Sequence, residues 1–134
     1  MLKDILIVDG YNVIFAWQQL KQLANESLEH ARMELRNQLL NYGKFKGYEV
    51  ILVFDGKYTK SIASIEEITK GFIEVYTDDG ETADSFIERE VFLRQGKYTN
   101  VYVVTSDGAE QNQILGSGGL RIPARELQND MRLA

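Results

Sequence analysis

The 134-residue sequence contains no cysteine, one histidine and one proline. The lack of cysteine excludes thiol nucleophiles, redox motifs and cysteine-based zinc sites, and a single histidine excludes a histidine-rich zinc site. No run approaches the roughly 18 apolar residues of a membrane span, and the opening Met-Leu-Lys-Asp-Ile lacks the apolar core of a signal peptide. We therefore expect a cytoplasmic protein without a membrane partner.

The sequence also contains fewer basic than acidic residues. Fifteen Lys and Arg face 20 Asp and Glu, which leaves a formal net charge of −5. This balance argues at first against nucleic acid, because Lys and Arg supply the non-specific affinity for phosphates. The contents of 44% hydrophobic and 26% charged residues are ordinary for a globular protein. The length predicts one domain over residues 1–134, large enough to fold without a disulfide or a metal.

Three short apolar runs dominate the sequence and predict strands at residues 5–8, 50–54 and 101–104. The runs are continuous and rich in β-branched residues, which is typical of strands buried on both faces of a parallel sheet. Residues 72–76 alternate more and predict an edge strand. Residues 120–122 predict a short fifth strand.

Helical patterns separate these strands. Apolar residues at three- and four-residue spacing from Leu28 to Tyr42 predict a helix, with Ser27 as its N-cap. A second helix is expected from Thr82 to Gly96, and residues 107–115 and 124–133 predict two more. Strands that alternate with helices predict an α/β fold in which a mainly parallel sheet forms the middle of a three-layer α/β/α sandwich.

An aspartate follows each of the three apolar strands. Asp9 and Asp55 come directly after their strands, and Asp107 comes two residues after the third. Because the carboxyl ends of parallel strands meet at one edge of a sheet, we expect these side chains to share one crevice. The alternative is that each is only a turn former or a helix cap.

Two further acids are expected near this crevice. Asp84 lies in the first turn of the second helix, and its spacing to Ile87 and Val91 predicts a place at the sheet-facing edge of that helix. The positive helix N-terminus is the alternative reason for a carboxylate there. Glu81 immediately precedes the helix and is expected to reach the same crevice as a supporting residue.

Several carboxylates in one crevice repel one another unless a cation is present. Hard oxygen ligands suit Mg²⁺ or Mn²⁺, which accept a few carboxylates, keep several waters and take phosphate oxygens as further ligands. Such ions activate water and hold a scissile phosphate. Because Asp9, Asp55, Asp84 and Asp107 carry four negative charges, they account for most of the net charge, and the acidity no longer excludes RNA.

The segment Ile7-Val8-Asp9-Gly10-Tyr11-Asn12 resembles the opening motif of the NYN-domain ribonucleases, especially the bacterial YacP-like type, within the PIN-like nuclease superfamily. The resemblance continues through Val53-Phe54-Asp55, Glu81-Thr82-Ala83-Asp84 and Val104-Thr105-Ser106-Asp107. It covers nearly the whole chain in the expected order. It implies a PIN-like Rossmannoid fold and metal-dependent endonucleolytic cleavage of RNA.

The resemblance also implies roles for individual residues. The implied catalytic acids are Asp9, Asp84 and Asp107, which we expect to hold the metal, with Asp55 as a further acidic member. Bacterial relatives resemble enzymes of mRNA decay, with the ribosome as a candidate partner. Such proteins often continue beyond the point where residues 124–133 stop without a C-cap, so we expect a further native C-terminal segment.

Other polar residues near the acids are candidates for substrate contacts. Asn12 is expected to orient a carboxylate or touch phosphate, with helix capping as the alternative. Ser106 is expected to contact phosphate, unless its hydroxyl only caps the strand end. Residues 56–71 contain lysines interleaved with an aromatic residue, a pattern that suits binding of single-stranded RNA. The alternative is that this segment is only a solvated loop and a short helix. The substrate-contact candidates in that segment are Lys57, Tyr58 and Lys60.

Two other functions stay open at this point. One is a non-catalytic PIN-like adaptor that binds RNA. The other is an aspartate-based phosphohydrolase, which is disfavoured because no second aspartate stands two residues after Asp9.

Overall fold

The protein folds as an open sheet with helices on both faces. The computed structural model describes residues 2–58, 62–105 and 118–133. The strands are β1 (Ile5–Asp9), β2 (Glu49–Phe54), β3 (Ser64–Thr69), β4 (Phe72–Tyr76), β5 (Val101–Thr105) and β6 (Leu120–Pro123). The helices are α1 (Gly10–Ala16), α2 (Gln18–Glu26), α3 (Leu28–Lys46), α4 (Ala83–Arg94) and α5 (Ala124–Leu133), with a 3₁₀ turn at Gly56–Tyr58. None of these helices is both long and apolar enough to cross a membrane.

The strands lie in the order β3-β4-β2-β1-β5-β6. β1 sits between β2 and β5 and is parallel to both. β4 and β6 extend the parallel arrangement outward, and only β3 runs antiparallel to its neighbour. The prediction of a mainly parallel α/β sheet is therefore confirmed.

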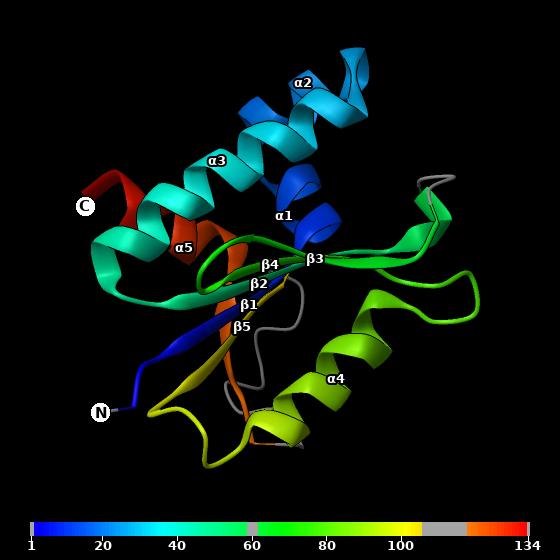
Figure 1. The fold of residues 1–134 in the computed structure, drawn as a ribbon. Helices are drawn as coiled ribbons and strands as arrows, with labels where there is room; N and C mark the ends of the chain where they lie inside the picture. The colour runs from blue at the N-terminus through cyan, green and yellow to red at the C-terminus, as the bar shows by residue number, and fades with distance from the viewer. Residues whose placement is uncertain (1, 59–61, 106–117, 134) are drawn as a thin grey trace.

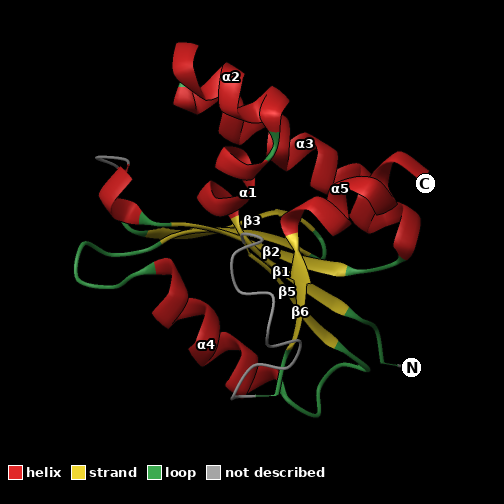
Figure 2. Ribbon diagram, turned by 180° about the vertical axis from the view of Figure 1, so that it is seen from behind, coloured by secondary structure: helices red, strands yellow, loops and turns green. Residues whose placement is uncertain are grey.

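Two separate cores hold the layers together. Helices α1, α2, α3 and α5 cover one face of the sheet, and α4 packs against the other (Figure 1 and Figure 2). Leu6 and Val8 point into the core under the four helices. Ile5 and Ile7 point the other way and pack with α4. Because both faces of β1 are covered, its apolar run is continuous, and the predicted three-layer sandwich is confirmed.

The predicted N-cap Ser27 and the predicted start of a helix at Thr82 are also confirmed. The Ser27 hydroxyl accepts a hydrogen bond from the backbone N–H of His30 at 3.1 Å. The Thr82 hydroxyl accepts one from the backbone N–H of Ser85, also at 3.1 Å. These caps set where α3 and α4 begin, and α4 thereby starts next to the carboxyl edge of the sheet.

The prediction that residues 72–76 form an edge strand is wrong. β3 folds back on β4 and takes the edge position instead. The alternation in β4 comes from Glu74, which is 3% exposed and accepts two hydrogen bonds from the guanidinium of Arg36, at 2.8 and 2.9 Å. Glu74 therefore resembled a solvent-exposed residue in the sequence, although it is buried in an ion pair with Arg36.

Two regions differ from the expected helices. Residues 10–26 form α1 and α2, for which the sequence analysis made no prediction. The helix expected at residues 107–115 lies outside the described residues.

Candidate active site

Two acidic side chains stand where β1 and β2 end. Asp9 is the last residue of β1, and Asp55 follows Phe54, the last residue of β2. The two strands are paired in parallel with Asp9 opposite Val53. Asp9 and Asp55 continue the alternation of Ile7 and Val53, so both emerge on the face of the sheet that α4 covers.

The glycine after each aspartate allows close packing of the backbone. A Cβ on Gly10 would lie 2.3 Å from a ring carbon of Phe54. A Cβ on Gly56 would lie 2.0 Å from the backbone oxygen of Thr77, whose hydroxyl accepts the Gly56 N–H at 3.0 Å. Both distances are far below van der Waals contact. A side chain at either position would therefore force these neighbours apart, and glycine avoids this at both strand ends.

Asp9 is buried, with 5% of its surface exposed. The side-chain amide of Asn12 donates a hydrogen bond to its carboxylate. Burial raises the pKa of the Asp9 carboxyl to about 6, and the negative charges of Asp84 and Asp55 add to the rise, while hydrogen bonding from Asn12 partly opposes it. The carboxylate form of Asp9 is thus held at an energetic cost that a nearby cation would remove.

Asn12 lies inside α1, so the capping alternative for this residue is wrong. Its amide instead orients the Asp9 carboxylate. Tyr11, the residue before it, had no assigned role in the sequence analysis. The Tyr11 ring packs on Phe54, and its hydroxyl accepts a hydrogen bond from Arg32 at 3.2 Å. The position of Tyr11 within the Asp-Gly-Tyr-Asn motif could have indicated that it belongs to the site.

Asp55 joins the end of β2 to the start of α4. One carboxylate oxygen accepts the backbone N–H of Lys57 at 3.0 Å, so Asp55 does form the turn expected as its alternative role. The other oxygen accepts the backbone N–H of Ala83 at 3.3 Å. Ala83 is the first residue of α4, so Asp55 fixes the position of this helix against the sheet.

Asp84 does not lie at the sheet-facing edge of α4, contrary to the prediction. It is exposed, because Ala83, Phe86 and Ile87 form the buried face of the helix and Asp84 projects from its flank. Asp84 nevertheless lines the same pocket as Asp9, and its negative charge helps to raise the pKa of Asp9.

These residues surround an open pocket of about 210 Å³ at the carboxyl edge of the sheet. The floor and one wall come from β1 and α1, and the opposite wall comes from the start of α4. The lining residues are Asp9, Tyr11, Asn12, Phe15, Asp55, Lys57, Thr82, Ala83 and Asp84. Three carboxylates, one amide, one lysine and two aromatic rings thus meet in one hollow.

A sequence model of one family, described as the YacP-like NYN domain, matches residues 6–134. The chain belongs to the YacP-like NYN domain family. A protein of Bacillus subtilis (strain 168), named "Uncharacterized protein YacP", is 42% identical over 129 residues, which are 96% of this chain and 75% of that protein.

Solved structures agree with this assignment. The crystal structure of Rae1 (YacP) from Bacillus subtilis has a TM-score of 0.81 and 39% sequence identity, and the match covers 97% of this chain and 74% of that one. A mutant of the same protein gives a TM-score of 0.80 at 38% identity, with coverage of 97% and 75%. The α/β fold expected from the resemblance, that of the PIN-like nucleases, is thereby confirmed.

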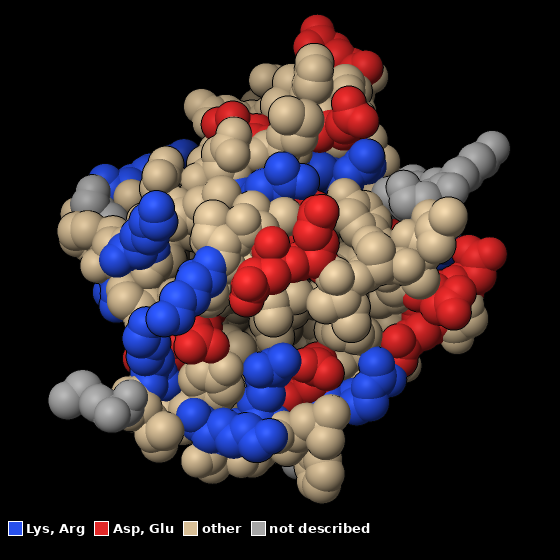
Figure 3. Space-filling view, in the orientation of Figure 1, with Lys and Arg blue, Asp and Glu red and all other residues tan. Residues whose placement is uncertain are grey.

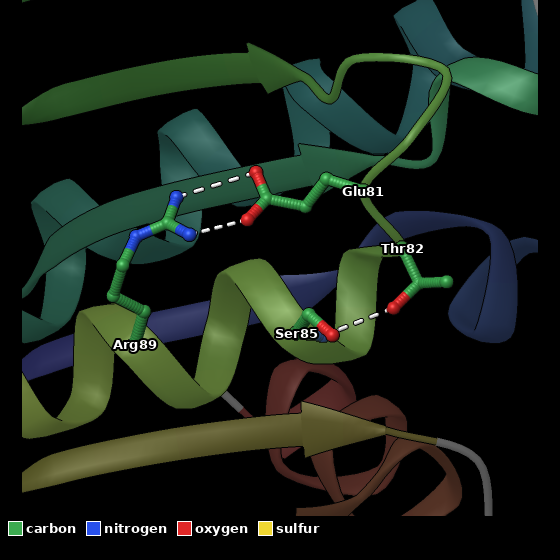
Figure 4. Close-up of polar contacts among 4 residues, drawn as sticks. All are labelled: Glu81, Thr82, Ser85 and Arg89. Atoms are coloured by element: carbon green, nitrogen blue, oxygen red, sulfur yellow. Dashed lines mark hydrogen bonds and ion pairs between the residues drawn. The ribbon is translucent and has the colours of Figure 1, made fainter.

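Not every candidate residue of the NYN domain lies in the pocket. The Glu81 carboxylate turns away and pairs with the exposed Arg89 guanidinium, which lowers the pKa of Glu81, while Thr82 caps α4 beside it (Figure 4). Glu81 is absent from the pocket lining. Lys60, Ser106 and Asp107 lie outside the described residues, and of Tyr58 only the backbone is described, within the 3₁₀ turn.

The pocket of the NYN domain provides donors of the type that Mg²⁺ or Mn²⁺ prefers. Among the described residues no three acidic side chains are close enough together to hold one ion. Magnesium is often bound by only one or two carboxylates, with waters and phosphate oxygens as its remaining ligands. Asp9 and Asp84, which line the pocket together, fit this requirement.

Proposed function

We propose that this NYN domain is a metal-dependent endoribonuclease that hydrolyses phosphodiester bonds of single-stranded RNA. The observation that carries the proposal is the buried Asp9 carboxylate, whose pKa is raised to about 6 inside a pocket that it shares with Asp55 and Asp84. Holding a buried carboxylate close to other carboxylates costs free energy, and such an arrangement is typical of a functional site rather than of stable packing. The family of the chain, the YacP-like NYN domain, supports a nuclease or RNA-related role.

In this proposal Asp9 and Asp84 hold Mg²⁺ or Mn²⁺, and Asp107, outside the described residues, completes the set. When bound, the ion supplies the activation of water and the stabilisation of charge on the phosphate. Asn12 fixes the orientation of the Asp9 carboxylate through its amide. Asp55 holds the first turn of α4, and with it Asp84, at the correct distance from β1.

The substrate contacts come from the other side chains of the pocket. Lys57 is exposed at its rim and pairs with a backbone phosphate. Phe15 is 44% exposed beside Tyr11, with the two rings stacked at 6.2 Å between centroids. An exposed ring of this kind stacks on an unpaired base, which favours single-stranded RNA over a duplex.

We further propose that the substrate is mRNA and that the ribosome presents it. The molecular face in Figure 3 carries basic and acidic side chains next to each other. The net charge of −5 adds to the expectation of weak non-specific affinity for RNA. A partner that raises the local concentration of RNA compensates for this weakness and gives the enzyme a role in mRNA decay.

A circular, unstructured RNA tests the proposed activity, because it has no ends and only an endonuclease linearises it. The wild-type protein is expected to linearise it with Mg²⁺ or Mn²⁺ and to leave it intact with a chelator. Asp9→Asn and Asp84→Asn are expected to lose this activity, and Asp79→Asn, in an exposed turn outside the pocket, is the charge-matched control. Binding without cleavage under all conditions would make the domain an RNA-binding adaptor instead.

A further inference from the structure

Arg121 is a cation in the middle of the short strand β6. It pairs in register with Val103 of β5, which belongs to the core under α4, so the Arg121 side chain leaves the sheet on the α4 face. One guanidinium nitrogen, Nη1, donates a hydrogen bond to the Thr105 hydroxyl at 2.6 Å. Thr105 is the last residue of β5, and the guanidinium therefore extends toward the carboxyl edge of the sheet.

This position is close to the candidate active site. β5 lies between β6 and β1, and Val104 is paired with Val8, so Thr105 stands beside Asp9. Neighbouring strands are about 4.8 Å apart, which places the hydroxyl that Arg121 contacts one strand away from Asp9. Arg121, Asp9 and Asp55 emerge on the same face of the sheet (Figure 2 shows β6 and β5 side by side).

The described residues use little of the hydrogen-bonding capacity of Arg121. The ion pairs found within residues 2–58, 62–105 and 118–133 involve Arg36, Lys46, Arg89 and Arg94 but not Arg121. The Arg121 Nε is buried and has no hydrogen-bond acceptor in the same part of the chain. A guanidinium carries five N–H donors, and a buried one without an acceptor costs free energy.

We propose that Arg121 binds a non-bridging phosphate oxygen of the RNA strand, next to the phosphodiester held at Asp9 and Asp84. The proposal rests on the ribonuclease activity proposed above. The planar guanidinium matches two oxygens of one phosphate, so Nε and a second nitrogen gain acceptors together. Its positive charge opposes the repulsion between the phosphate and the aspartates of the pocket. The hydrogen bond to Thr105 fixes the guanidinium at that edge before RNA arrives.

Salt-dependent RNA binding tests this role. The probe is a short, fluorescently labelled, unstructured RNA oligonucleotide, measured without divalent metal so that it stays intact. Arg121→Met is expected to weaken binding by about tenfold or more, which is the loss of one charged hydrogen bond. It is also expected to lower the slope of log K against log salt by about 0.7, the value for one phosphate contact on a single strand. Arg121→Lys is expected to keep the slope but to bind more weakly, because it loses the planar donor pair.

Arg132→Met is the matched control, since it removes the same charge from an exposed position on α5, in the layer opposite α4. It is expected to leave the affinity and the slope unchanged. A purely structural Arg121 would instead give an Arg121→Met variant that unfolds at lower temperature and binds RNA with the wild-type slope. We expect an unfolding temperature equal to or above that of the wild type, because the substitution removes a buried donor that has no acceptor among the described residues.

The outcomes separate this inference from the proposed function. If wild type neither binds nor cleaves RNA, both fail together. If wild type cleaves RNA and Arg121→Met cleaves subsaturating RNA equally fast, the ribonuclease stands and the role of Arg121 is overturned. If Arg121→Met does not fold, Arg121→Lys decides, and an affinity equal to the wild type would overturn the inference.

Discussion

The carboxylate of Asp55 accepts the first backbone N–H of α4, that of Ala83, at 3.3 Å. This contact joins two elements that are 28 residues apart in sequence, and it brings the residue after Ala83, Asp84, to the edge where Asp9 ends β1. Asp55 therefore acts on the site through the position of a helix. Its two hydrogen bonds to backbone explain why an aspartate in a turn is also part of the pocket.

Asp55→Ala is expected to destabilise the protein by about 1–2 kcal/mol, because the backbone N–H groups of Ala83, at the start of α4, and of Lys57 lose their carboxylate acceptor. Urea unfolding measures this change. Asp55→Asn keeps one acceptor oxygen and is expected to lose less stability. Asp79→Ala, which removes the same charge from an exposed turn, is the control. Equal stability of Asp55→Ala and Asp79→Ala would show that Asp55 does not hold α4.

The raised pKa of Asp9 predicts a pH-dependent effect of Asp9→Asn without metal. The carboxyl has a pKa of about 6 in the folded protein and of 3.8 in the unfolded chain, so folding favours its protonated form. The wild type therefore loses stability relative to the variant as the pH rises from about 4 to 6, and the loss is complete above that range. Asp9→Asn is expected to be more stable by up to about 3 kcal/mol at neutral pH.

Thermal unfolding at several pH values measures this difference, which is expected to vanish as the pH falls well below 4. Asp79→Asn is expected to show no such pH-dependent gain. A variant that is less stable than the wild type at neutral pH would contradict the electrostatic cost assigned to Asp9.

Mg²⁺ is expected to reverse this order. A cation bound at Asp9 and Asp84 stabilises only the folded state, so the unfolding temperature of the wild type rises with Mg²⁺ concentration. Asp9→Asn and Asp84→Asn are expected to lose most of this rise, and Asp79→Asn is expected to retain it. Differential scanning fluorimetry gives the measurement, and equal shifts in all four proteins would place the ion elsewhere.

The two glycines at the strand ends are expected to be sensitive to the smallest substitution. Gly10→Ala and Gly56→Ala each place a methyl group against Phe54 or the Thr77 backbone, at 2.3 and 2.0 Å, and overpacking of this kind costs about 1–3 kcal/mol. Gly80→Ala is the control, because nothing lies within 4 Å of its added Cβ. Chemical unfolding of the three variants checks the order, and an equal effect at all three sites would contradict the close approach.

The sequence was sufficient to predict the parts of the fold in which local pattern and burial agree. Continuous apolar runs marked β1, β2 and β5, because both faces of these strands are covered. Ser27 and Thr82 marked helix starts, because an N-cap is a local interaction between residues three positions apart.

Other features depend on partners that are distant in sequence. Most residues of β3 are exposed, and the strand exists because it pairs with β4, which no local pattern reveals. The seven-residue helix α1 follows β1 without an intervening loop. Glu74 resembled a solvent-facing residue because its partner, Arg36, lies 38 positions away.

The candidate site divides in the same way. Asp9 and Asp55 were predictable from the strand ends, because the edge of a parallel sheet brings them together. The exposure of Asp84 and the turn of Glu81 toward Arg89 depend on how α4 is rotated, which spacing alone does not fix. Arg121 was visible as a charge between Leu120 and Ile122, but its direction follows only from the register of β6 on β5.

The central claim is that Asp9 serves metal-dependent cleavage of RNA at this edge of the sheet. The most direct measurement is the initial rate of linearisation of a circular unstructured RNA in Mg²⁺, for wild type and Asp9→Asn that are both shown to be folded. We expect cleavage by the wild type, none in chelator, and a rate for Asp9→Asn lower by about 10² or more, since loss of one charge-stabilising group costs at least that factor. Cleavage by Asp9→Asn at the wild-type rate would contradict it.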